Sequence, residues 1–361
     1  MSRTTDERSL APRALARAAA QRDHADGLQA KVDFLSSPAA YPERPARVEA
    51  RETHMSWVFL TDGTAYKLKK PVVYPYLDFS TLQAREARCR DEVRLNRRLA
   101  PDVYLGVARL TREADGRLAI DGDGATIDWL VRMRRLPEHR TLEQLIVRGE
   151  LAPAHVAQIG ELLARFYRGL APAEVDARRY VELLRAQHDA NAGLLLRPDF
   201  ALDGAATARI LAALDRFFDA GRALLEARAA GGHVVEGHGD LRPEHVFLLD
   251  APVVIDCLEF NRALRLVDPF DEIGFLGLEC ERLGASWVGP QLRRDLEAQL
   301  GDRIDDRLQS FYVALRACLR ARLALAHLTE PEPREPHKWP QRARDYLALA
   351  QRAVGEIAQT R

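Results

Sequence analysis

The sequence predicts an α+β fold made of a small antiparallel sheet and a larger, mostly helical part. Segments with strand-like alternation are concentrated between residues 48 and 133. After Pro137, apolar residues recur three and four positions apart almost throughout, which indicates helices. Two short apolar runs, 246–249 and 253–255, are joined by a turn and predict a β-hairpin within the helical part. We therefore expect two domains, 1–136 and 137–361.

The first domain should begin with a loose arm, because residues 1–26 are polar and rich in Arg and Ala. A short helix is expected at 28–35, and a main helix at 80–99 with Ser80 as a possible N-cap. Asp62-Gly63 is typical of a hairpin turn between two strands. Strands are predicted at 48–52, 57–61, 65–69, 103–110, 118–120 and 128–133.

The second domain should be helical on both sides of the hairpin. In the segment RACLRARLALAHL, the arginines predict a solvated stripe opposite an apolar core, and a phosphate-binding face is the less favoured alternative. Asp271 is expected either to cap the helix that follows it or to brace the hairpin loop. Helices are predicted at 141–147, 154–169, 177–192, 205–229, 272–282, 308–328 and 341–358.

Composition and charge argue against several function classes. Lys+Arg and Asp+Glu both number 53, so no net field favours nucleic acid or an anionic membrane. No apolar run approaches the ~20 residues needed to cross a bilayer. The N-terminus lacks the apolar core of a secretory signal, and the four dispersed cysteines indicate reduced thiols. We expect a cytoplasmic protein without nucleic-acid or membrane partners, and the oligomeric state stays open.

The loop before the hairpin and the residue after it carry the chemistry. The loop opens with His238-Gly239-Asp240, and the second apolar run ends in Asp256. A hairpin would hold these two carboxylates on one edge. Phosphoryl transfer needs such a pair, a base beside a metal-holding acid, because positioning and charge neutralisation supply most of its catalysis.

These residues resemble the catalytic loop of the aminoglycoside phosphotransferases, a family with a protein-kinase-like fold whose usual motif is HGDLHxxN. The segment VVIDCLEFNRALRLVDPFDEIGFL is closer to a mostly uncharacterised bacterial subfamily, some of whose members carry a fused P-loop ATP-binding domain. This chain contains no GxxxxGK[ST] motif. The similarity extends from about Lys31 to about Leu349. It implies a two-lobed fold, with a small nucleotide-binding sheet lobe and a helical lobe that holds the catalytic loop and an acceptor pocket.

The resemblance also implies which residues of the sheet lobe bind the nucleotide. AYKLKK at 65–70 resembles the third-strand lysine motif, and Lys67 and Lys69 share one face of a strand. We assign Lys67 to the α- and β-phosphates, with Lys69 second. Glu92 occupies the place of the glutamate that pairs with the lysine, and Glu86 is the alternative.

Two further nucleotide contacts are expected at the ends of strands. The loop 53–56 should lie over the phosphates. It contains no glycine, so its backbone amides and the Ser56 hydroxyl would be the donors. The backbone around Met133 should meet the base.

In the helical lobe, Asp240 is expected to be the catalytic base, and His238 should brace the loop through backbone hydrogen bonds. Asp256 should bind the metal, with Glu259 as a further contact. His245 stands where the family has a metal-binding Asn, and an imidazole is a poor ligand for Mg²⁺. Arg242 likewise replaces the family's usual His. If His245 points away, Asp256 would hold the ion with Glu259 or Glu244.

The sequence thus predicts an ATP- or GTP-dependent phosphotransferase that uses Mg²⁺ or Mn²⁺ and modifies a hydroxyl of an unidentified small molecule. The alternative is a catalytically weak pseudokinase that binds a nucleotide or a partner as a regulatory module. The His245 substitution and the glycine-free loop favour the alternative, whereas Asp240, Asp256 and Lys67 oppose it.

Overall fold

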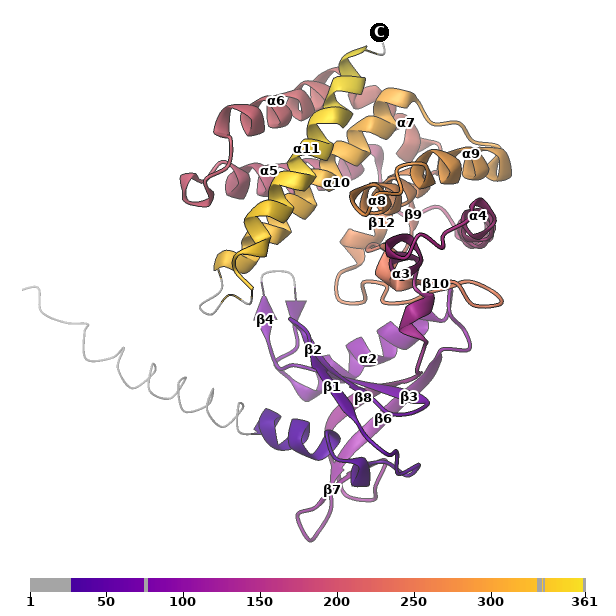
Figure 1. The fold of residues 1–361 in the computed structure, drawn as a ribbon, viewed down its shortest axis with the longest axis vertical. Coiled ribbons are helices and arrows are strands. Elements are labelled where there is room, and N and C mark those ends of the chain that lie inside the picture. The colour runs from indigo at the N-terminus through magenta and orange to yellow at the C-terminus, as the bar shows by residue number, and fades with distance from the viewer. Residues whose placement is uncertain (1–26, 75–76, 330–332, 334, 360–361) are drawn as a thin grey trace, which may run out of the picture. The chain divides into compact units, whose positions relative to one another are not determined.

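The computed structural model of this chain describes residues 27–74, 77–329, 333 and 335–359. The arm expected at residues 1–26 lies outside them. The chain divides into two compact units, 1–136 and 137–361. In Figure 1 the first unit is mainly sheet and the second is mainly helical, which agrees with the predicted α+β class.

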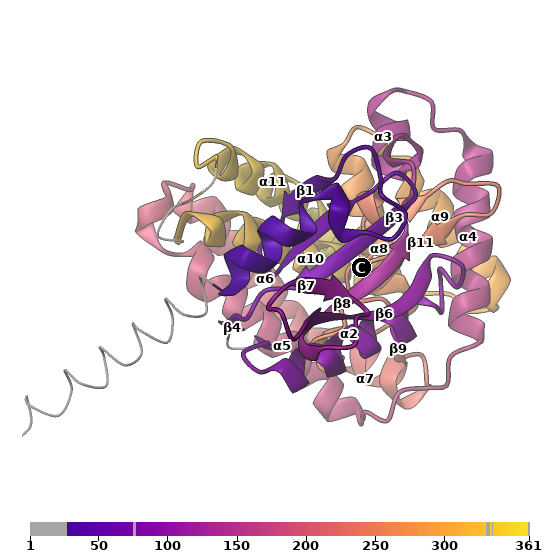
Figure 2. The ribbon, with the colours of Figure 1, turned by 90° about the horizontal axis from the view of Figure 1, so that it is seen from below.

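The first unit contains a six-stranded antiparallel sheet (Figures 1 and 2). The predicted strands correspond to these six within a few residues. A separate two-stranded hairpin, β4 (Val73–Tyr74) with β5 (Leu77–Asp78), is too short to show a period in the sequence. In spatial order the six strands are β1 (Glu49–Glu52), β2 (Ser56–Leu60), β3 (Thr64–Lys69), β8 (Ala125–Arg134), β6 (Tyr104–Arg112) and β7 (Leu118–Ile120).

The two faces of this sheet are covered differently, because side chains alternate along β3. Tyr66 and Leu68 enter an apolar core shared with the helical residues 27–35. Lys67 and Lys69 lie on the other face, against α2 (Leu82–Asn96). Thr81, rather than Ser80, caps α2 by accepting a hydrogen bond from a backbone N–H of its first turn.

The second unit is built from helices, and most of them match the predicted segments. The predicted helix 205–229 is divided in two at Gly221, a weak helix former. One helix, α9, was not predicted, because Gly289 and Pro290 in its first turn obscure the period. The helices are α3 (Leu142–Val147), α4 (Pro153–Arg168), α5 (Ala177–Leu195), α6 (Gly204–Ala220), α7 (Arg222–Ala230), α8 (Pro269–Arg282), α9 (Val288–Leu300), α10 (Asp306–Ala326) and α11 (Lys338–Gln359).

Short strands hold the predicted hairpin and the chain before it. β10 (Val246–Phe247) pairs with β11 (Val253–Val254), as the sequence predicts. β9 (Val235–Glu236), just before the loop 238–245, pairs with β12 (Leu266–Val267), just before α8. The loop 238–245, called the HGD loop below, is therefore anchored at both ends.

Two expectations for the second unit are wrong. Arg316 was expected on a solvated stripe but is buried, and its Nε and Nη2 donate to the Asp271 carboxylate at 2.8 and 2.6 Å. Asp271 therefore neither caps α8 nor braces the HGD loop. Asp268 is the cap, since its side chain accepts the Phe270 N–H at 2.9 Å. Helical periodicity cannot reveal a buried ion pair between two helices.

All four cysteines are buried free thiols, in agreement with the expectation of reduced thiols. In the part of the chain that the structure describes, none of the helices has the length and apolar character needed to cross a membrane.

Candidate active site

A lysine–glutamate cluster lies between β3 and α2 in the first unit. Lys67 Nζ is 2.9 Å from Glu92 Oε1, and Lys69 Nζ is 2.5 Å from Glu92 Oε2. The Glu92 carboxylate is completely buried, so it holds both ammonium groups in place. Glu86, the alternative partner, pairs instead with Arg90 on the outer side of α2 at 2.8 Å.

The two lysines differ in accessibility. The Lys69 side chain is 1% exposed, and its Nζ lies 5.1 Å from the centre of the Phe79 ring. The Lys67 side chain is 15% exposed. A cation enclosed between a carboxylate and an aromatic ring contributes to packing, whereas contact with a ligand requires exposure. The geometry is thus consistent with Lys67 as the main phosphate lysine.

The loop between β1 and β2 is a braced turn. Thr53 Oγ1 accepts the Ser56 N–H at 3.0 Å, and Lys70 Nζ donates to the Thr53 carbonyl at 2.7 Å. The Lys70 N–H also donates to the Met55 carbonyl at 2.9 Å. Ser56, predicted as a phosphate contact, is buried, and its amide is already bonded within the turn.

Met133 lies in the sheet itself, between Ala65 of β3 and Tyr104 of β6. The next two amides are also used within the first unit, since Arg134 N–H donates to Val103 O at 2.8 Å and Arg135 N–H to Gly63 O at 2.9 Å. A nucleotide base can therefore take no hydrogen bond from these two amides. The contact of the base near Met133 stays a prediction.

In the second unit, one buried carboxylate supports the HGD loop. Glu272 of α8 accepts the backbone N–H of His238 at 3.1 Å, the N–H of Gly239 and the hydroxyl of Tyr167 at 2.8 Å. Gly239 has a φ of +87°, and a Cβ there would lie 3.0 Å from the Leu264 carbonyl oxygen. The loop conformation therefore requires glycine at this position, and Glu272 fixes it.

His238 links the HGD loop to the hairpin. Its Nδ1 accepts the Asp240 N–H at 3.2 Å, so its Nε2 carries the proton and donates to the Ile255 carbonyl at 2.9 Å. Burial lowers the pKa of His238 to about 4. The ring is therefore neutral at neutral pH, and both nitrogens are occupied. These are the backbone contacts expected of a positioning residue.

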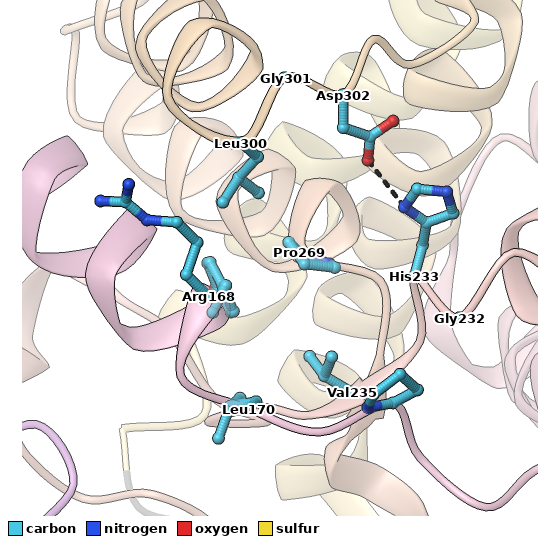
Figure 3. Close-up of a pocket in the computed structure, with 11 residues that line it drawn as sticks. Arg168, Leu170, Gly232, His233, Val235, Pro269, Leu300, Gly301 and Asp302 are labelled. Atoms are coloured by element: carbon cyan, nitrogen blue, oxygen red, sulfur yellow. Dashed lines mark ion pairs between the residues drawn. The ribbon is translucent and has the colours of Figure 1, made fainter.

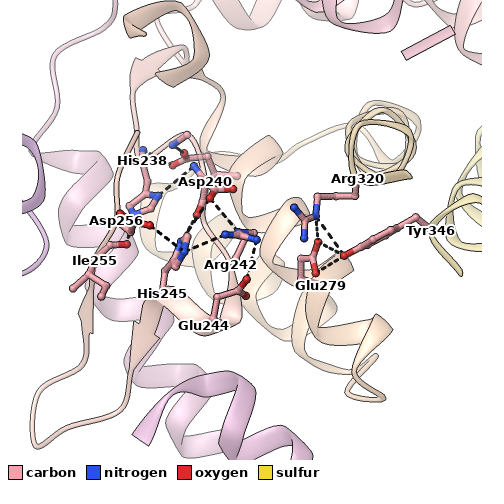
Figure 4. A network of polar contacts seen from close by, with 12 residues as sticks. His238, Asp240, Arg242, Glu244, His245, Ile255, Asp256, Glu279, Arg320 and Tyr346 are labelled. Atoms are coloured by element: carbon pink, nitrogen blue, oxygen red, sulfur yellow. Dashed lines mark hydrogen bonds and ion pairs between the residues drawn. The ribbon is translucent and has the colours of Figure 1, made fainter. Parts of the chain in front are cut away.

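Asp240 belongs to a compact charged network (Figure 4). Arg242 Nε lies 3.1 Å from Asp240 Oδ2, and its Nη1 lies 2.8 Å from Glu244 Oε1. His245 Nδ1 donates to the Asp240 carbonyl at 2.9 Å, so its Nε2 is left to accept from Arg242 Nη2 at 3.2 Å. Burial raises the pKa of Asp240, but the charges of Arg242 and Arg320 help to outweigh it, and the pKa lies below its usual value. Asp240 is thus an ionised carboxylate.

Asp256 lies beside this network in an unusual backbone conformation. Its φ is 64°, a left-handed value that Asp tolerates better than most residues. The chain is fixed on both sides, since Ile255 N–H donates to His245 O at 3.0 Å and Leu258 N–H to His238 O at 3.1 Å. The Asp256 carboxylate is 44% exposed, with Oδ2 3.6 Å from His245 Nε2.

Asp256 and His245 can form a two-ligand metal site, and the further contact from Glu259 stays a prediction. Across the described ranges, no group of three side chains is arranged to hold a metal ion, and Glu259 is buried. Mg²⁺ often takes only one or two protein ligands and completes its shell with phosphate and water. Asp256 and His245 are close enough for such a site. His245 Nε2 can bind a cation only after Arg242, its present donor, withdraws.

A pocket of about 270 Å³ opens in the second unit, and none of the predicted site residues lines it (Figure 3). Tyr167, whose hydroxyl donates to Glu272, lines it. On its edge, His233 Nδ1 lies 3.0 Å from Asp302 Oδ2. Its remaining walls are largely apolar and include Leu170, Pro172, Val235, Pro269 and Leu300.

Three residues near the HGD loop were missed by sequence reasoning. Glu272 stands in the run DPFDE, where several acids compete for one role, and only the fold shows which of them reaches the loop. Glu279 and Arg320 lie on different helices, and their ion pair at 2.6 Å has no local sequence signal.

Comparison with known sequences gives relatives that are described as uncharacterised proteins. No protein-family model matches the chain. Uncharacterised proteins of Mycobacterium tuberculosis and Mycobacterium bovis are 33% identical to it over 289 residues, which is 79% of this chain. The match covers 56% of each relative, so the chain spans about half the length of the curated relatives it matches.

Comparison with solved structures shows the fold. A choline kinase from Cryptosporidium parvum matches with a TM-score of 0.53 at 9% identity, over 91% of this chain and 96% of that one. A thermostable mutant of the aminoglycoside phosphotransferase APH(4)-Ia matches with a TM-score of 0.50 at 12% identity, over 87% and 94%. These similarities confirm the kinase-like fold predicted from the HGD loop and the hairpin.

Proposed function

We propose that this chain, which has the fold of the choline kinases and aminoglycoside phosphotransferases, is a phosphotransferase that moves the γ-phosphoryl group of ATP or GTP to a hydroxyl of a small molecule. The observation that carries the proposal is the HGD loop. An ionised Asp240 is held there by backbone and arginine contacts, next to the exposed carboxylate of Asp256.

Asp240 would act as the base. It would accept a hydrogen bond from the acceptor hydroxyl and take its proton as the new oxygen–phosphorus bond forms. The bond from the γ-phosphorus to the bridging oxygen breaks, and the nucleoside diphosphate leaves. The proton passes from Asp240 to solvent. His238 is excluded as the base, since both of its ring nitrogens are engaged.

Lys67 would bind the α- and β-phosphates, with its ammonium group held by Glu92. Asp256 and His245 would hold a divalent cation, Mg²⁺ or Mn²⁺, which neutralises charge on the phosphates. The backbone at Asp256 is left-handed, and a backbone hydrogen bond lies on each side of it. Together they fix the direction of the Asp256 carboxylate.

The alternative is a pseudokinase that binds a nucleotide or a partner with little or no transfer. The contact from Arg242 to His245 favours it, because a guanidinium already occupies the nitrogen that would have to bind the cation. The braced loop 53–56 favours it too, since its Ser56 amide is not available to phosphate.

Two measurements on purified protein separate these functions. A thermal-shift panel of ATP, GTP, Mg²⁺ and Mn²⁺ tests nucleotide binding, and labelled ATP with pooled metabolites tests transfer. Asp240→Asn should keep nucleotide binding and lose transfer by orders of magnitude, because the proton acceptor is removed without loss of volume. Asp250→Asn, in the exposed hairpin turn, is the matched control. Transfer by Asp240→Asn at the wild-type rate would exclude Asp240 as the base, and nucleotide binding without transfer in the wild type would favour the pseudokinase.

A further inference from the structure

Arg320 of α10 presents unused hydrogen-bond donors near the HGD loop. Its side chain is 14% exposed, and its Nε donates to Glu279 Oε1 at 2.6 Å and to the Tyr346 hydroxyl at 3.3 Å. Within the described residues, neither of its terminal amino groups has a hydrogen-bond partner. In Figure 4 the guanidinium extends from α10 toward the side on which Arg242 and Asp240 lie.

The charge of Arg320 acts on the proposed base. Burial raises the pKa of Asp240, and Arg242 and Arg320 help to lower it below its usual value. Burial likewise raises the pKa of Glu244. The charge of Arg242 and, less strongly, that of Arg320 lower this pKa, and the outcome is a value below the usual one. Arg320 thus acts on Asp240 and Glu244 through its charge, and Figure 4 shows its guanidinium on the side that faces them.

The support behind Arg320 fixes its position and engages only its Nε. Glu279 is 1% exposed and accepts hydrogen bonds from Arg320, from Arg282 at 3.3 Å and from the Tyr346 hydroxyl at 2.8 Å. One carboxylate thus serves two guanidinium groups, and both of these lie over the Tyr346 ring. Glu244, on the HGD loop, is already paired with Arg242.

We propose that the acceptor carries an anionic group, a carboxylate or a phosphate, which the terminal amino groups of Arg320 bind while its hydroxyl lies on Asp240. The inference rests on the proposed phosphotransferase function. The planar fork of a guanidinium matches the oxygens of carboxylate and phosphate, and charge-assisted hydrogen bonds of this kind are strong. An amino alcohol would bring a cation next to the guanidinium of Arg320, whose partner Glu279 is shared with Arg282. The acceptor class of this chain therefore differs from the choline named for the structurally similar kinase.

The test is a charge-resolved acceptor screen. A bacterial metabolite extract is separated by anion exchange into a retained and an unretained fraction, and each fraction is incubated with the full chain and ATP labelled at the γ-phosphate. The labelled product should form from the retained, anionic fraction. The labelled product is then identified. In a parallel sample the retained fraction is treated with phosphatase before the assay. The treatment removes phosphate-bearing acceptors and leaves carboxylate-bearing acceptors intact. Labelled product from the unretained fraction alone would overturn the inference.

Arg320→Lys is the main variant, because a lysine can keep the ion pair with Glu279 but lacks the fork. For the Arg320→Lys variant, the KM for the acceptor found in the screen should rise about tenfold or more, while the KM for ATP stays unchanged. Arg320→Gln should lose more, and Arg352→Gln, which removes an exposed arginine of α11, should change neither value. An unchanged acceptor KM in a folded Arg320→Lys protein would refute the role of Arg320. Transfer from neither fraction would instead contradict the proposed function itself.

Discussion

The buried His238 should make the second unit sensitive to acid. The side chain is 1% exposed, and burial lowers its pKa to about 4. In the unfolded chain a histidine titrates near ~6.5. Below that pH the unfolded state binds a proton that the folded state excludes, so stability falls as the pH drops from about 6.5 to about 4. The full loss from this one group is about 3 kcal/mol.

His238→Gln is the variant that tests this value. A glutamine side chain can accept the Asp240 N–H and donate to the Ile255 carbonyl, but it does not titrate. Urea unfolding of the full chain at pH 7.5 and pH 4.5 should show a smaller loss of unfolding free energy in the variant than in the wild type, by about 2–3 kcal/mol. His139→Gln, at an exposed position, is the control and should behave as the wild type. Equal losses in His238→Gln and the wild type would refute the assignment of a buried neutral imidazole.

Three further predictions concern the proposed site. Lys67→Ala should abolish most of the thermal stabilisation by ATP and change the melting temperature of the ATP-free protein little. Lys69→Ala should lower the melting temperature of the ATP-free protein more, because Lys69 is the buried partner of Glu92. Equal losses of ATP stabilisation in the two variants would contradict the assignment. Gly239→Ala should lower the melting temperature and abolish transfer, since φ is +87° there; a variant with wild-type stability would contradict the account of the loop. His245→Asn should raise the Mg²⁺ affinity of the ADP-bound protein in calorimetric titrations, since an amide oxygen suits Mg²⁺ better than imidazole; unchanged affinity would remove His245 from the metal site.

The features that sequence alone predicted are those with a local pattern. The six strands of the sheet correspond to segments recognised in the sequence, and the hairpin at 246–255 is bounded by a clear turn. The pairing of Lys67 with Glu92 was also expected, because both residues stand at positions of a recognisable motif. In each case the information lies within one segment or one motif.

The features that were missed depend on contacts between distant segments. Arg316 and Asp271 form a buried pair across two helices, which a helical period cannot distinguish from a solvated arginine. Glu272 supports the HGD loop only because α8 passes behind it. Likewise, the role proposed for Arg320 could not be predicted, because only the fold shows that Glu279 and Tyr346 hold its guanidinium.

The central claim is tested most directly by ³¹P NMR of the full chain with ATP, Mg²⁺ and a metabolite extract. The account predicts that the γ-phosphate resonance of ATP declines while a phosphomonoester resonance grows, and that Asp240→Asn shows neither change over the same time. Persistence of ATP in the wild type, or its conversion to inorganic phosphate alone at the same rate in both proteins, would contradict the account.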